Sequence, residues 1–174
     1  GPWLVHPAPI NNGLVMVPGA AWAEKRWPVE RFAELARACT EAGQAVRVLL
    51  SSGDQLELEG INWGAAELTL DASIEQCVAH LAGADAVLAN DTGFAHVAEG
   101  LGRPLVVLIG PTDQRMGAAP QGAARHSLGL RLNLDCQPCS QKGDRRCRVG
   151  GRPCLTELSM SQVQDALAAV VAAH

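Results

Sequence analysis

Short apolar runs alternate along this chain with segments of helical periodicity, and that alternation limits the folds the chain can adopt. Runs rich in Val, Leu and Ala predict buried strands, at residues 14–17, 45–50, 67–70, 86–89 and 104–109. Apolar residues at helical spacing predict helices, at residues 30–43, 74–81, 94–101 and 160–173. Strands that alternate with helices form a parallel sheet wrapped by those helices, so the sequence predicts an α/β fold.

Two segments carry more detailed expectations. Ser73 is the expected N-cap of the second helix, whose inward face would carry Ile74, Val78 and Leu81. At about 117–158 the alternation stops, and Gly, Pro, Arg and Cys dominate an irregular excursion of the kind that is usually functional or held locally. We therefore expect residues 1–174 to form a single domain that ends in a helix at 160–173.

The composition excludes several classes of protein. A length of 174 residues with 48% hydrophobic and 18% charged residues suits one compact domain. A formal charge of -4 and few aromatic residues argue against nucleic-acid binding, which needs a basic face or a stacking platform. No apolar run reaches the roughly 20 residues of a membrane span. Six Cys without a secretory signal point to a reducing compartment. The sequence starts at Gly1-Pro2 without Met, which suggests that upstream residues are missing.

Ligands of open parallel sheets bind at the carboxyl ends of the strands, and the first such loop carries unusual residues. Gly19, Ala20 and Ala21 let the backbone approach a ligand closely, and Lys25 offers a positive charge to an anion. A surface loop with a solvated Lys25 and a Trp packed on the next helix is the alternative.

The second loop, Asp91-Thr92-Gly93, comes at the expected start of a helix. The main-chain N–H groups of Thr92 and Gly93 would form an anion site there, and His96 lies one turn further on the same face. Asp91 would repel a phosphate, so its expected functional role is to accept hydrogen bonds from sugar hydroxyls. The alternatives are that Asp91 is only the helix N-cap and that His96 is structural.

The third loop, Gly110-Pro111-Thr112-Asp113, follows the strongest predicted strand and by itself is typical of a simple turn. The three loops in this order, with Lys25-x-Trp27-Pro28 in the first and Leu101-Gly102-x-Pro104 behind the second, form a specific combination. On these residues the chain resembles the glycosyltransferase family that includes the ADP-heptose:lipopolysaccharide heptosyltransferases. The resemblance is to the C-terminal domain of that family and runs from about Leu14 to the C-terminus.

The resemblance implies the C-terminal half of a GT-B glycosyltransferase, a Rossmann-like, doubly wound parallel sheet that holds the nucleotide sugar. The N-terminal domain of the family, which holds the acceptor and the general base, would be absent. We therefore expect this chain alone to bind donor weakly and not to transfer sugar. The implied donor is ADP-heptose, the implied acceptor is the lipopolysaccharide core, and the implied location is the bacterial cytoplasm.

The resemblance also implies roles for individual residues. Lys25 would neutralise the diphosphate of the leaving nucleotide, with Asp91 and His96 next to the sugar and the diphosphate. The amides of Thr92 and Gly93 would stabilise the charge that develops on the diphosphate as the bond to the sugar breaks. No Asp-x-Asp motif is present, and GT-B enzymes typically need no divalent metal, so no cofactor is expected for the chemistry.

The resemblance places Asp54 beside the ribose and Ala72-Ser73 beside the adenine. One departure concerns Ala20 and Ala21, where some relatives carry hydroxyl residues that bind phosphate. Only backbone N–H groups can serve at these two positions here, so the phosphate contacts would differ from those of such relatives, and the donor could differ with them.

Four cysteines lie close together in the irregular segment: Cys136, Cys139, Cys147 and Cys154. Their spacing is compatible with a structural zinc or iron site, although reduced thiols that pack a loop, or disulfides formed after purification, are alternatives. The same segment holds five of the 14 Lys and Arg, between Lys142 and Arg152. These form either a solvated basic loop or a peripheral contact with anionic lipid or a phosphorylated acceptor at the inner membrane.

Two other functions remain open beside the glycosyltransferase. One is a non-catalytic nucleotide-binding or metal-knuckle interaction module on a Rossmann-like scaffold. The other is a sugar-nucleotide epimerase or hydrolase built on the GT-B scaffold.

Overall fold

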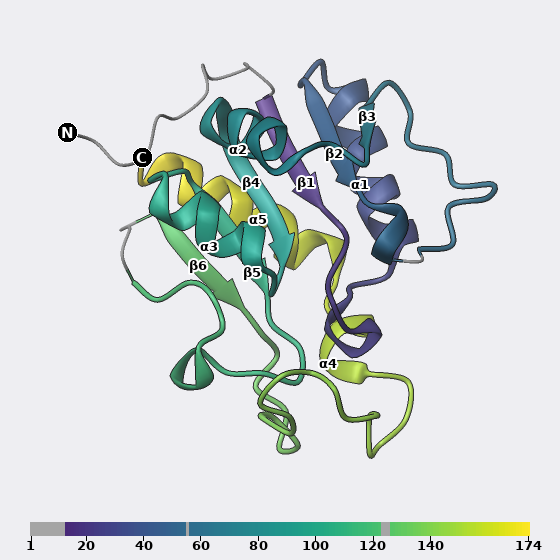
Figure 1. Cartoon of the computed structure of the whole chain (residues 1–174), viewed down its shortest axis with the longest axis vertical. Helices are drawn as coiled ribbons and strands as arrows, with labels where there is room; N and C mark the ends of the chain where they lie inside the picture. Colours follow the sequence, from purple (N-terminus) through teal and green to yellow (C-terminus); the bar gives the residue numbers. More distant parts are fainter. Residues whose placement is uncertain (1–12, 55, 123–125) are drawn as a thin grey trace.

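A single six-stranded sheet organises the molecule. The computed structural model describes residues 13–54, 56–122 and 126–174 (Figure 1). The strands are all parallel and lie in the order β3-β2-β1-β4-β5-β6. Their bounds are β1 Gly13–Val17, β2 Val46–Leu50, β3 Glu67–Leu70, β4 Ala84–Asn90, β5 Leu105–Leu108 and β6 Ser127–Leu130. This is the strand order of the Rossmann fold, so the predicted doubly wound α/β fold is confirmed.

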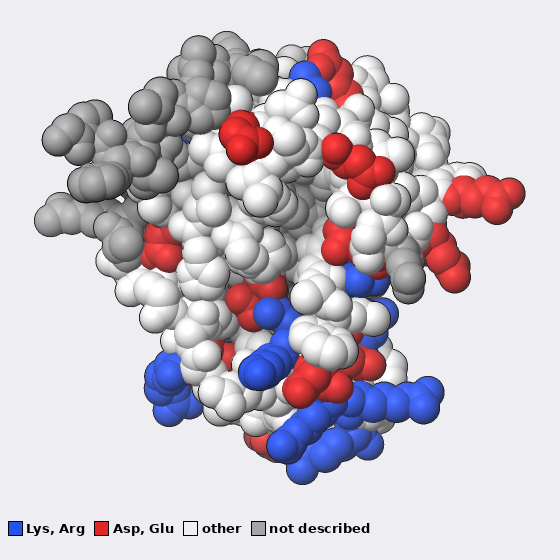
Figure 2. Space-filling model, viewed as in Figure 1, with Lys and Arg blue, Asp and Glu red and all other residues white. Residues whose placement is uncertain are grey.

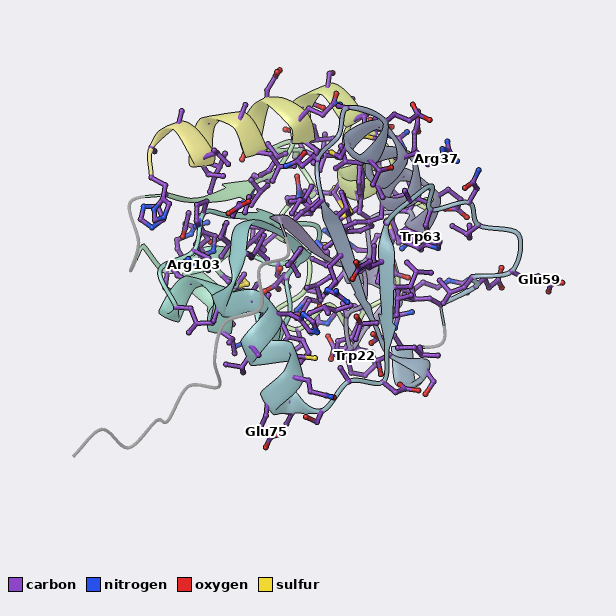
Figure 3. The ribbon with its side chains drawn as sticks, turned by 90° about the horizontal axis from the view of Figure 1, so that it is seen from above. Trp22, Arg37, Glu59, Trp63, Glu75 and Arg103 are labelled. Carbon is purple, nitrogen blue, oxygen red and sulfur yellow. The ribbon has the colours of Figure 1, made fainter. Side chains whose placement is uncertain are left out.

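Helices cover both faces of the sheet, and each face has its own apolar core. The α-helices are α1 Val29–Glu41, α2 Ile74–Ala82, α3 Gly93–Gly100, α4 Pro153–Thr156 and α5 Met160–Ala172, and three short 3-10 helices are Ala23–Lys25, Ser52–Asp54 and Gln114–Met116. Figure 3 shows α5 on one side of the sheet and α2 and α3 on the other. Because side chains alternate along a strand, Leu14 and Met16 of β1 pack with α1 and α5, whereas Val15 and Val17 pack with α2 and α3.

Local sequence accounts for where most helices begin. Ser73 and Ser159 form capping boxes with Gln76 and Gln162, in which each serine hydroxyl accepts from the main chain three residues on and the glutamine side chain accepts in return. The predicted N-cap at Ser73 and the predicted C-terminal helix are therefore confirmed, and that helix buries Val163, Leu167 and Val170.

Two sequence predictions are wrong. The segment expected to be irregular from residue 117 contains β6, which pairs with β5 at the sheet edge, and the short helix α4. The strand was missed because an edge strand needs few apolar residues of its own when a fully buried neighbour supplies the hydrogen bonds. Ile74, expected to face inward, is 71% exposed at the first position of α2, and Val78 is only partly buried, so Leu81 alone of the three predicted residues is fully buried.

The order of the strands reverses between β1 and β4, and the loops that follow these two strands meet there. Such a reversal opens a crevice beyond the carboxyl ends of the strands. In Figure 1 these ends point to the lower part of the molecule, where the loop after β1, the loop after β5 and the segment after β6 gather. Within the described ranges, no helix is long and apolar enough to cross a membrane.

Candidate functional site

An ion pair joins the two loops at the strand reversal. Lys25, which follows β1, places its Nζ 2.7 Å from Oδ2 of Asp91, which follows β4. The Thr112 hydroxyl, after β5, donates to the same Asp91 oxygen at 2.8 Å. The side chain of Asp91 is 6% exposed and that of Lys25 is 15% exposed, so the pair is largely shielded from water. The three loops identified in the sequence therefore meet through side chains.

Buried hydrogen bonds hold the loop that carries Lys25. The Asn90 side chain accepts from the Trp27 N–H at 3.0 Å and donates to the Pro18 carbonyl at 2.6 Å, which ties both ends of the loop to β4. Arg26 donates twice to the Ala20 carbonyl inside the loop. Arg152, from the segment after β6, donates to two further carbonyls of the loop, those of Ala23 and Arg26. Lys25 is therefore presented by a fixed backbone.

The start of α3 lies directly beside the ion pair. Thr92, not Asp91, is the N-cap, because its hydroxyl accepts from the Phe94 N–H at 3.0 Å. The alternative in which Asp91 only caps the helix is thus wrong, since Lys25 and Thr112 both engage its Oδ2. Among the described residues no hydrogen bond reaches Asp91 Oδ1, so one carboxylate oxygen remains available to a ligand.

Two adjoining cavities open at this place. The smaller, of about 340 Å³, is lined by Lys25, Asp91 and His96, and also by Gln141 and Lys142 from the segment after β6. The larger, of about 640 Å³, extends toward the ends of β2 and β3 and is lined mostly by apolar surface. Ala21, Thr92 and Gly93 line both cavities, so the start of α3 forms the boundary between them. A hollow in this central region is visible in Figure 2.

The larger cavity contains the other residues that the sequence singled out. Gly19, Ala20 and Asp54 line it, together with Ala72 and the exposed Ile74. A Cβ atom on Gly19 would overlap the Asp54 carboxylate, so the absence of a side chain at Gly19 lets the Asp54 carboxylate lie against the loop after β1. Burial raises the pKa of Asp54, and the nearby Arg26 acts in the opposite direction. Ser73 does not line the cavity, because its hydroxyl is used to cap α2.

A second charged cluster supports the loop after β5. Asp113 accepts from the main chain and side chain of Arg115 and, through its other oxygen, from Arg131 at 2.7 Å. These hydrogen bonds hold the pKa of Asp113 well below its ordinary value of 3.8, and the bonds from Arg115 contribute most to this lowering. The Gly110-Pro111-Thr112-Asp113 segment is therefore held in place by these ion pairs and positions Thr112, and it is not a simple turn.

The four cysteines of the segment after β6 lie near one another. Burial, and then the charges of Cys147, Cys139 and Cys136, raise the pKa of the Cys154 thiol to about 11. All four are free thiols, and no three His, Cys, Asp or Glu side chains of the described ranges stand in an arrangement that would hold a metal ion. Of the two remaining cysteines, Cys77 is buried and Cys39 is partly buried.

Charge is distributed unevenly over the molecule. Lys and Arg gather at the lower end in Figure 2, where the segment after β6 lies, and acidic side chains are more frequent higher up and to the right. The basic residues Arg145, Arg146 and Arg148 are exposed and do not line either cavity. Lys142 is exposed and does line the smaller cavity.

Sequence reasoning missed several residues that shape this site. Asn90 and Arg152 anchor the Lys25 loop, Thr112 orients Asp91, and Gln141 and Lys142 complete the smaller cavity. Asn90 was foreseeable, since a polar residue at the end of an otherwise apolar strand requires a buried partner. The contribution of residues 141–142 depends on how a long segment returns to the sheet, which no local pattern specifies.

Comparison with known proteins agrees with this geometry. Residues 7–149 match the model of glycosyltransferase family 9 (heptosyltransferase). Lipopolysaccharide heptosyltransferase 1 of Pseudomonas aeruginosa is 33% identical over 132 residues, which cover 74% of this chain and 36% of that protein. The chain thus spans little more than a third of this curated relative.

Solved structures show the same fold. The ADP-heptose LPS heptosyltransferase II of E. coli superposes with a TM-score of 0.70 at 25% identity, over 94% of this chain and 47% of that one. TibC, an iron-containing dodecameric glycosyltransferase of enterotoxigenic E. coli, gives a TM-score of 0.72 at 16% identity, over 96% of this chain and 48% of that one. TibC has also been solved in complex with ADP-D-beta-D-heptose. The chain belongs to glycosyltransferase family 9, the heptosyltransferase family, and corresponds to about half of a GT-B heptosyltransferase.

Proposed function

We propose that this chain is the donor-binding domain of a glycosyltransferase that transfers a heptose from ADP-heptose to a lipopolysaccharide core acceptor. The observation that carries the proposal is the Lys25–Asp91 pair, whose charged atoms are 2.7 Å apart and which lines the smaller cavity beside the start of α3. A cation and free main-chain N–H groups together suit a diphosphate. The larger, mainly apolar cavity suits the adenosine, with Asp54 beside the ribose.

In this proposal the acceptor hydroxyl attacks the anomeric carbon, and the bond from that carbon to the phosphate oxygen breaks. Its electron pair passes to the departing diphosphate, while the proton of the acceptor goes to a general base outside this chain. Lys25 and the main-chain N–H groups of Thr92 and Gly93 stabilise the negative charge that develops on the diphosphate. Losing one such contact typically raises the barrier by about 3 kcal/mol.

Asp91 has two tasks in the proposed complex. Its Oδ2 holds the Lys25 ammonium in place, with the Thr112 hydroxyl fixing the carboxylate. Its Oδ1 can accept a hydrogen bond from a sugar hydroxyl, as the sequence suggested. His96, exposed and one turn along α3, lies at the wall of the smaller cavity, where it can donate to the diphosphate or the sugar.

Calorimetric titration of the chain with ADP, UDP, GDP and CMP tests the donor. We expect ADP to bind at least about tenfold more tightly than the other three, because the apolar cavity selects the base while the phosphates are common to most of them. Equal affinity for all four nucleotides, or no binding of any, would contradict an ADP-heptose donor.

We further propose that Cys136, Cys139, Cys147 and Cys154 hold a structural zinc or iron ion. The donor set fits, because four thiolates suit a tetrahedral site for either metal, and the relative TibC contains iron. The thiols are near one another, but they must draw closer to form a coordination sphere. The metal would fix the segment that supplies Gln141 and Lys142 to the cavity, and it would take no part in the chemistry.

Metal analysis of protein purified under reducing conditions checks this second proposal. We expect about one zinc or iron per chain, lost in Cys136→Ser and Cys147→Ser and retained in Cys39→Ser. Cys39 is the matched control because it belongs to α1 and not to the segment after β6. Metal-free protein, or metal that survives both substitutions in the segment, would rule the site out.

A further inference from the structure

Lys25 alone gives the smaller cavity little net attraction for an anion. Its ammonium is paired with Asp91, and the two opposite charges largely cancel when seen from the cavity. A nucleoside diphosphate sugar carries negative charge on both phosphates. A site built only from this pair and the start of α3 would have to hold that ligand with almost no net positive charge from its side chains.

Lys142 supplies the charge that is missing. It lines the same cavity as Lys25, Asp91 and His96 but comes from a different part of the chain, the segment after β6. Its side chain is exposed, and within the described ranges no ion pair engages it. Among the charged side chains that line the smaller cavity, Lys142 is thus the one whose charge is not already compensated.

The backbone on both sides of Lys142 is anchored to the site. The N–H groups of Cys139 and Ser140 donate to the Pro111 carbonyl at 2.9 and 3.1 Å. Ser140 is buried, with 4% of its surface exposed. Its hydroxyl accepts from the Gly143 N–H at 2.8 Å and donates to the Asp144 carboxylate at 2.9 Å. The lysine therefore extends from a fixed turn.

Gly143 places that turn directly on Lys25. Its φ is +80°, and a Cβ atom there would overlap Cγ and Cδ of the Lys25 side chain. The main chain next to Lys142 therefore packs on the methylene stem of Lys25. Lys25 and Lys142 both border the smaller cavity.

We propose that Lys142, presented by the cysteine-bearing segment, is a second cation beside Lys25 for the diphosphate of the nucleotide sugar. This inference rests on the proposed function, since it assigns a residue to the same donor site. It also separates Lys142 from Arg145, Arg146 and Arg148 of its segment, which are exposed and line neither cavity.

Titration of the chain with ADP, adenosine and inorganic pyrophosphate tests the assignment. Lys142→Ala is compared with Arg146→Ala, which removes the same charge from the same segment outside the cavity, and with Lys142→Arg, which keeps the charge. We expect Lys142→Ala to weaken ADP and pyrophosphate about tenfold and to leave adenosine unchanged, because only the phosphates contact the lysine. Arg146→Ala should change ADP affinity by less than about twofold, and Lys142→Arg should retain most of it.

Two results would overturn the inference while the proposed function stands. One is ADP affinity in Lys142→Ala equal to that of the unaltered chain. The other is an equal loss of ADP affinity in Lys142→Ala and Arg146→Ala, which would show that the segment acts through its overall positive charge and not through a contact of Lys142 with the phosphates. Conversely, if the unaltered chain binds pyrophosphate through Lys142 but shows no preference for ADP, the lysine assignment holds and the ADP-heptose donor fails.

Discussion

The buried charges of Lys25 and Asp91 depend on each other. Each side chain is largely out of water, at 15% and 6% exposure, and each neutralises the other across 2.7 Å. Removing one partner of such a pair leaves the second charge desolvated, which costs far more than the pair itself contributes. Stability and ligand binding are therefore linked at this position, and single substitutions would mix the two effects.

Lys25→Met and the double variant Lys25→Met/Asp91→Asn separate these effects. The single variant should lower the free energy of unfolding by about 3 kcal/mol, because Asp91 loses its counter-charge. The double variant should recover most of that stability, since no buried charge remains, yet both variants should bind ADP at least about tenfold more weakly. Chemical denaturation and calorimetric titration measure the two quantities. A double variant that regains ADP affinity would show that Lys25 does not contact the phosphates.

At the scale of elements, the segment after β6 is part of the site although it contributes little regular structure. It returns to the sheet through main-chain hydrogen bonds to Pro111 and through Arg152, which donates to the Lys25 loop. Its four cysteines and its positive-φ glycines, among them Gly143, Gly150 and Gly151, shape a compact turn rather than a loose loop. This segment therefore contacts Lys25 at Gly143 and holds the loop that carries Lys25 through Arg152.

Gly143→Ala and Gly150→Ala form a matched pair for testing that coupling. Both glycines have a φ near +80°, at +80° and +77°, so alanine should cost each about 1 kcal/mol of unfolding free energy. Only at Gly143 would the new Cβ meet Lys25, whereas nothing lies within 4 Å at Gly150. We expect Gly143→Ala alone to weaken ADP binding, by about fivefold or more as Lys25 is displaced. Equal ADP affinity in the two variants would contradict the coupling.

For the whole molecule, the cavities open at the carboxyl end of the sheet, where a second domain faces the donor in a GT-B enzyme. The E. coli heptosyltransferase II structure contains about twice the length matched here, since this chain covers 47% of it. In the proposed division of labour, this chain holds the donor, and the acceptor and general base lie elsewhere.

Incubation of the 174-residue chain with ADP-heptose and a lipopolysaccharide core acceptor checks that division. We expect binding of ADP without measurable transfer, because the proposal places the general base that activates the acceptor hydroxyl outside this chain. Chromatographic analysis of the acceptor would detect any added heptose. Transfer by this chain alone would place the general base within it and contradict the division.

Local patterns in the sequence determined the strands β1 to β5, the helices α1, α2, α3 and α5, and the loops that carry Lys25 and Asp91. Each depends on neighbouring residues, through apolar periodicity, capping and the strand-to-loop transition, and such features can be inferred before the chain is folded. Tertiary structure alone decided that β6 completes the sheet, that Asp91 is paired rather than capping α3, and that Lys142 and Gly143 reach the site. These outcomes are contacts between residues more than 20 positions apart, such as Asp91 with Thr112 or Lys25 with Gly143, and packing rather than local propensity fixes them.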